Sequence, residues 1–122
     1  MSLKQSSSAP SAPRVAGENS LICWHRERNR NCLRIESTPS DTFLLPYQQF
    51  LGAHHARAGD SETLRISFTT HDVTLSGRQL GEIALALQDL AVEWVKPLPE
   101  RYQGLAHDDG AKVTRVEIKA VE

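Results

Sequence analysis

The sequence has no long apolar run and almost no net charge. Uninterrupted apolar stretches such as FLL at 43–45 and LAV at 90–92 are far short of the roughly 18 residues that span a bilayer. A formal net charge of −1 gives no global attraction to DNA, RNA or an anionic membrane. We therefore expect no membrane segment, and any nucleic-acid binding must rely on a local cluster of basic residues.

Targeting signals and cysteines are also scarce. The N-terminal segment has neither the apolar core of a secretory signal nor the arginine content of a transit peptide. Two cysteines without an export signal are typical of a reducing compartment, where thiols stay reduced. These features predict a cytoplasmic protein.

The familiar catalytic motifs are missing from the 122 residues. There is no G-x-S-x-G elbow, no phosphate-binding P-loop, no dinucleotide glycine pattern and no H-E-x-x-H zinc motif. We therefore predict no catalytic residues and no cofactor, and a binding module is favoured over an enzyme.

What the chain does contain is enough apolar sequence for one domain. Hydrophobic residues make up 39% and charged residues 24%, as in ordinary globular proteins. Residues 1–20 hold six serines and two prolines but few large apolar side chains, so they cannot bury enough surface to become ordered. We expect a flexible tail at 1–20 and a single domain at 21–122.

Alternating apolar residues predict several antiparallel strands. LICWH and CLRIE pair in register as a hairpin if Arg28-Asn29 is the turn, which sets Trp24 against Leu33. Residues 42–57 form one bent strand or two short ones with a kink at Pro46.

Two later segments alternate more cleanly. ETLRISF and HDVTLS form a hairpin with Phe68 opposite Val73, closed by Thr69 to Asp72 or by a tighter Thr70-His71 turn. The last segment, KVTRVEIKAVE, forms a strand with Val116, Ile118 and Ala120 facing inward.

The apolar period changes from 2 to 3.6 after Ser76, which predicts one amphipathic helix over 77–95. Ser76 and Gln79 have the spacing of a capping box, and Pro97 marks the helix end. The apolar stripe comprises Leu80, Ile83, Ala84, Leu87, Leu90, Ala91 and Trp94.

These elements predict an α+β fold in which the helix covers a curved antiparallel sheet of about five or six strands. The order of the elements suggests a pleckstrin-homology-like outline, with an Sm-like small barrel as the alternative. Either outline describes shape and implies no function.

The stretch CWHRERNRNC at 23–32 concentrates potential ligands. Cys23, His25 and Cys32 are chemically suitable for zinc, but the spacing C-x-H-x6-C matches no standard zinc motif and lacks a fourth ligand. The predicted register sets Cys23 against Arg34, so two reduced, partly buried thiols are favoured over a disulfide.

The same region could bind nucleic acid. Four arginines against Glu27 give residues 26–34 a net charge of +3, and a tryptophan lies beside them. Six acidic residues against two basic ones give 81–110 a net charge of −4, which suggests a charge-complementary contact between copies or with a partner. The candidate nucleic-acid residues are Trp24, Arg26, Arg28, Arg30 and Arg34.

Two weaker sites involve histidines and glycines. His54 and its neighbour His55 point to opposite strand faces, so either one would need His71 and Asp72 to form a metal or acid–base site. Gly77 and Arg78 lie at the start of the predicted helix, where free N–H groups could hold an anion. Solvated histidines and a glycine that eases the turn are the favoured interpretations. Asp108-Asp109-Gly110 predicts a turn and lacks the ligands of a calcium loop.

LLPY at 44–47, FTTHDVTLSG at 68–77 and Leu80 resemble a pattern in small uncharacterised bacterial proteins. These have a proline-tyrosine strand, a threonine-histidine turn and a glycine before a leucine-rich helix. The resemblance implies a bacterial cytosolic protein and no particular chemistry.

The leading hypothesis is a non-enzymatic interaction or regulatory module that self-associates. An edge strand such as 112–121 offers backbone N–H and C=O groups to a second copy. Nucleic-acid binding through hairpin 24–34 is one alternative, and a small metal- or anion-binding enzyme is another.

Overall fold

The computed structural model describes residues 22–99 and 110–121, so the predicted tail at 1–20 and residues 100–109 of the predicted late loop lie outside it. Within the described residues the chain forms mostly strands and one α-helix. In chain order the elements are β1 (Trp24–Arg26), β2 (Cys32–Thr38), β3 (Asp41–Pro46), the 3-10 turn η2 (Tyr47–Gln49), β4 (Phe50–Ala58), β5 (Ser61–Phe68), β6 (His71–Arg78), α3 (Gly81–Gln88), β7 (Val92–Val95) and β8 (Lys112–Ala120).

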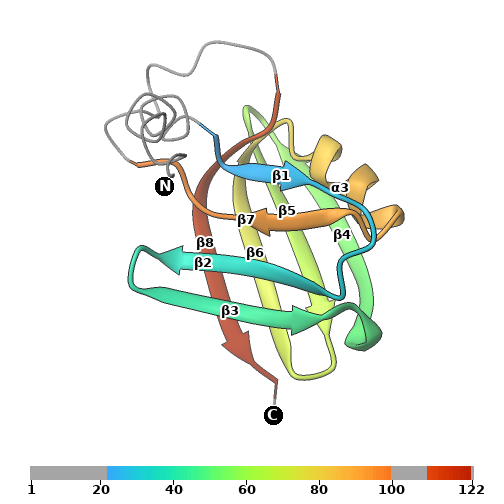
Figure 1. Cartoon of the computed structure of the whole chain (residues 1–122). Helices are drawn as coiled ribbons and strands as arrows, with labels where there is room; N and C mark the ends of the chain where they lie inside the picture. The colour runs from blue at the N-terminus through green and yellow to red at the C-terminus, as the bar shows by residue number, and fades with distance from the viewer. Residues whose placement is uncertain (1–21, 100–109, 122) are drawn as a thin grey trace, which may run out of the picture.

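The strands form two four-stranded sheets, in the orders β1-β7-β2-β3 and β4-β5-β6-β8. Figure 1 shows the first sheet lying across the face of the second, with the two strand directions crossing steeply. The α+β class is therefore right in its broad form, but two sheets replace the expected curved sheet of about five or six strands. Each sheet has one apolar face, and stacking buries both faces together.

The core lies between the two sheets and extends beneath α3. Alternate residues of the strands enter it, as period-two patterning requires. Fully buried side chains come from both sheets and from the helix region, and include Leu33, Ile35, Leu64, Ile66, Leu75, Leu80, Ile83, Val92 and Val95.

The predicted hairpin between LICWH and CLRIE is wrong. Trp24 pairs with Val95 of β7, and Leu33 pairs with Leu45 of β3. Strand β7 lies between β1 and β2 and runs parallel to β2. The connection from β1 to β2 therefore passes β7. Asn29 does adopt a positive φ of 65°, as its side chain allows, but it lies in a connection between non-adjacent strands.

The predicted helix over 77–95 is too long at both ends, because α3 spans only Gly81–Gln88. Residues 77 and 78 belong to β6, and 92–95 form β7. The predicted capping box is also wrong, since Ser76 lies in β6 and the N-cap residue Leu80 has no side-chain cap. Within the described ranges, no helix has the length and apolar character needed to cross a bilayer.

Three local strand predictions are confirmed with adjusted registers. The chain kinks after Pro46, where η2 separates β3 from β4. Strands β5 and β6 form a hairpin, but Ile66 and not Phe68 faces Val73, so Thr69-Thr70 is the turn. In β8, the predicted inward residues are only partly buried at 116 and 118 and exposed at 120.

Candidate functional site

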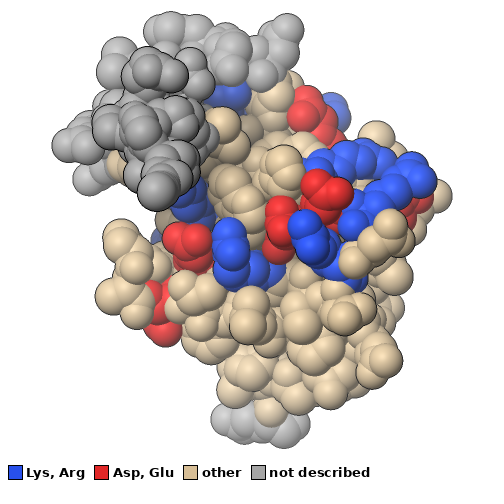
Figure 2. Space-filling view, viewed as in Figure 1, with Lys and Arg blue, Asp and Glu red and all other residues tan. Residues whose placement is uncertain are grey.

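The outward face of β1, β7 and β2 carries most of the residues that the sequence singled out. The strand register aligns His25, Trp94, Arg34 and Leu44 in one row across the sheet. Figure 2 shows basic and acidic side chains interleaved across this face, with an uncharged area below them. We call the surface formed by residues 25–30, 34, 36, 89, 93 and 94 the charged face.

The arginines of the charged face form ion pairs within the chain. Arg26 lies 2.9 Å from a carboxylate oxygen of Asp89, and Arg30 lies 3.1 Å from one of Glu93. Two longer pairs join Arg28 to Asp89 at 4.0 Å and Arg34 to Glu36 at 3.9 Å.

Among the described residues, the basic segment 26–34 therefore pairs with Asp89 and Glu93 of the acidic segment inside one molecule. The four arginines of this surface pair with three carboxylates in all, those of Glu36, Asp89 and Glu93. A nucleic-acid phosphate would have to displace these carboxylates, which weakens the support for the nucleic-acid alternative.

The aromatic residue on the charged face is Trp94 and not Trp24. Trp24 pairs with the buried Val95 and packs against the core. Trp94 stacks on the His25 ring, with centroids 6.3 Å apart and planes 14° apart, and the Lys96 ammonium lies 5.4 Å from its centre. Sequence reasoning missed Trp94 because it fits the helical stripe; the flanking Val92 and Val95 are the strand signal.

His25 faces two carboxylates. Its Nε2 atom lies 3.6 Å from Oε1 of Glu27 and 3.7 Å from Oε1 of Glu93. His25, Glu27 and Glu93 each offer one potential ligand atom, and these three atoms all lie within 4.8 Å of one another. Arg30 contacts the other carboxylate oxygen of Glu93.

The two cysteines take no part in this group. Cys23 is buried, and its thiol donates to the Ala111 carbonyl at 3.3 Å and accepts from the Val113 amide at 3.4 Å. Burial outweighs the Val113 hydrogen bond and raises the pKa of the Cys23 thiol. Cys32 is a second free thiol, in β2, and β7 separates it from β1.

The start of α3 binds an anion that belongs to the chain itself. The Glu62 carboxylate accepts hydrogen bonds from the backbone N–H groups of Gln79 at 3.0 Å and Leu80 at 2.9 Å. His55 Nε2 lies 2.6 Å from the same carboxylate, and Arg57 lies at 4.0 Å. Burial alone would raise the pKa of Glu62, but these hydrogen bonds and the Arg57 charge together lower it.

This arrangement corrects the predicted anion site at Gly77 and Arg78. Both residues lie in β6, and the N–H groups at the helix start are already bonded to Glu62. Gly77 has a different role, because a Cβ at that position would overlap the backbone carbonyl of Lys112 in β8.

The other histidines that the structure describes, His54, His55 and His71, do not come together in one site. His54 lies on β4 and His71 on β6, with β5 between the two strands. His71 Nδ1 bonds the Thr70 hydroxyl at 2.9 Å, and its ring packs edge-on against Phe43. His55 bonds Glu62, the carboxylate that accepts hydrogen bonds from the start of α3.

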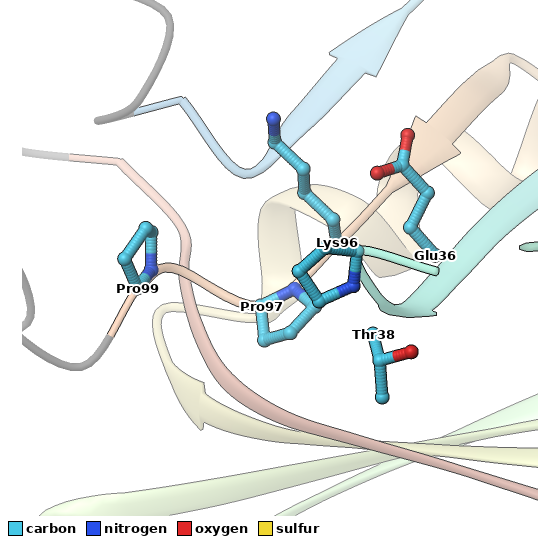
Figure 3. Close-up of a pocket in the computed structure, with 6 residues that line it drawn as sticks. Glu36, Thr38, Lys96, Pro97 and Pro99 are labelled. Atoms are coloured by element: carbon cyan, nitrogen blue, oxygen red, sulfur yellow. The ribbon is translucent and has the colours of Figure 1, made fainter. Parts of the chain in front are cut away.

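A small hollow of about 190 Å³ lies beside the end of β7. In Figure 3 the charged ends of Lys96 and Glu36 point to the same side of this hollow, away from Thr38. The other lining residues are Pro39, Pro97 and Pro99, so half of the lining residues are prolines.

One side of β8 has no neighbouring strand among the described residues. Strand β8 pairs with β6 alone and forms the left border of the rear sheet in Figure 1. At its start, the carbonyl of Val113 accepts from Leu98, and at its end the Val121 amide donates to Thr70. Because backbone groups alternate in an antiparallel ladder, those of residues 116, 118 and 120 point away from β6.

Comparison of the chain with protein-family models, with curated proteins and with solved structures finds no match. Function is therefore inferred from the geometry of the chain alone.

Proposed function

We propose that this chain is a non-enzymatic interaction module that self-associates by pairing β8 of one copy with β8 of a second. The observation that carries the proposal is the side of β8 that faces away from β6 over Val116–Ala120. Backbone groups on such a side gain hydrogen bonds when a second strand is added.

The sequence of β8 is complementary to itself in one register. An antiparallel pair with Ile118 on the two-fold axis joins the outward groups of Val116 to those of Ala120 in the other copy. The same register sets the exposed Glu117 opposite the exposed Lys119 of the second copy. Glu117 and Lys119 then form a non-hydrogen-bonded pair, in which opposite charges lie close together and are favourable.

Two of the three other sheet borders are less suited to a second copy. Strand β4 has a register shift between Phe50 and Gly52 and contacts α3. Strand β1 has only three residues. A bulge or a short length limits strand addition, whereas the last five residues of β8 pair with β6 without a register shift.

Exchanging the two charges of β8 tests the proposal. Glu117→Lys and Lys119→Glu each place like charges opposite one another, so we expect each to weaken the dimer at least roughly fivefold. The double variant restores opposite charges and returns the dimer. Sedimentation velocity over a concentration series at low ionic strength measures the dissociation constant.

A control comes from an exposed residue of another border strand. Asp41→Lys reverses a charge at the start of β3 and leaves β8 unchanged. Dimer formation that is lost in Asp41→Lys and retained in both single β8 variants would overturn the assignment to β8.

Three further properties belong to this proposal. They are a bacterial origin, a cytoplasmic setting and a pleckstrin-homology-like or Sm-like outline. The free thiols support a reducing setting, and the two stacked sheets support the outline. The nucleic-acid alternative predicts binding to generic RNA that weakens steeply with salt. A salt slope near zero would favour the interaction module.

A further inference from the structure

We propose that His25, Glu27 and Glu93 form a binding site for a divalent transition metal of the zinc class. This site is independent of the β8 contact, because it lies on the other sheet. Imidazole nitrogen and carboxylate oxygen are ligands that zinc accepts, and three protein ligands leave one position for water.

The distances from the His25 nitrogen to the two carboxylate oxygens are close to those between donor atoms around a metal ion. His25 Nε2 is 3.6 Å from a Glu27 oxygen and 3.7 Å from a Glu93 oxygen. Tetrahedral zinc with ligands at about 2.0–2.2 Å separates its donor atoms by about 3.3–3.6 Å. Small side-chain rotations would bring all three donors to bonding distance.

The backbone holds the three residues in place. Strand β1 pairs with β7, which sets His25 beside Trp94, and the Glu27 amide donates to the Ala91 carbonyl at 2.8 Å. Stacking of the His25 ring on Trp94 orients the imidazole. The imidazole is therefore already oriented before a metal binds.

The two carboxylates would attract a divalent metal ion, and the lone pair of the His25 nitrogen would bind it. Protons and metal therefore compete for His25, and metal binding weakens as the pH falls. Arg30 bonds Glu93 and competes as well, while Arg26 and Arg28 are bound to Asp89.

Isothermal titration of the full chain with ZnCl₂, in a buffer without chelators, tests the proposal. We expect one site per chain. His25→Ala and Glu93→Gln should each lower the affinity at least roughly tenfold. Arg30→Gln should raise the zinc affinity several-fold, because the substitution frees an oxygen of Glu93.

Two control variants separate this site from other zinc ligands. His54→Ala removes an exposed histidine on β4, and Cys32→Ser removes the partly exposed thiol; both should leave the affinity unchanged. Melting curves without metal establish that each variant is folded. Absence of zinc binding, or binding that survives His25→Ala and is lost in Cys32→Ser, would overturn the proposal.

Discussion

Gly77 shows how a single missing side chain positions a strand. The backbone of Lys112 occupies the space that a Cβ of Gly77 would need, so any other residue would push β8 away from β6. The register shift between Ser76 and Gly77 lies at the same point. Gly77 therefore fixes how the start of β8 lies against the sheet.

We predict that Gly77→Ala lowers the free energy of unfolding by about 1–3 kcal/mol, since backbone atoms must move. Gly81→Ala is the control, because its Cβ would lie 3.4 Å from the His55 ring and alanine favours a helix. Urea denaturation of both variants measures the difference. Equal losses in the two variants would contradict this role for Gly77.

The sequence predicted these individual residues only in part. The arginines of 26–34 were identifiable from their spacing, but their partners Asp89 and Glu93 lie about 60 residues away. Only the pairing of β1 with β7 brings Glu93 to His25. No local pattern contains that information.

At the level of the elements, the end of α3 decides the topology. Ala91 donates to the Ala86 carbonyl and Leu90 to the Leu87 carbonyl, which is a Schellman motif with Leu90 at φ 53°. This motif turns the chain so that 92–95 become β7. The spacing of Leu87, Leu90 and Trp94 continues the helical period, so periodicity alone could not predict the turn.

We predict that Leu90→Gly stabilises the protein by about 1 kcal/mol, because glycine adopts positive φ without steric cost. Leu90 is 42% exposed, so little packing is lost. Leu90→Ala keeps the unfavourable φ and should give no gain. A lower thermal midpoint for Leu90→Gly than for Leu90→Ala would show that this turn is not strained.

The start of α3 gives a prediction about pH. The lowered pKa of Glu62 means that its carboxylate stabilises the fold above the unfolded value of about 4.3, and this contribution is lost as the pH falls through the folded pKa. Glu62→Gln should cost about 1 kcal/mol at neutral pH, and this cost should shrink as the pH falls below the unfolded value.

Urea midpoints between about pH 3 and pH 7 test this dependence. Asp60→Asn, an exposed change in the turn before β5, is the control. A cost of Glu62→Gln that stays constant across the range would contradict a role for the ionised carboxylate.

For the whole molecule, the strands that alternate cleanly were predictable, and their division into two sheets was not. Strands β5, β6 and β8 and the kink at Pro46 follow from local patterns. The apolar residues of β1 and β2 can face the core in a β1–β2 hairpin. They can do so equally well in a sheet with β7 inserted between the two strands. Burial of Val92 and Val95 favours the inserted strand.

The central claim is that β8 of one copy pairs with β8 of another. Amide hydrogen exchange measured by NMR at low and high protein concentration tests it most directly. We predict that the amides of Val116, Ile118 and Ala120 exchange quickly in dilute solution and become protected on concentration, while those of Glu117 and Lys119, bonded to β6, are protected throughout. Unchanged exchange at these three amides in a sample that does dimerise would contradict the account.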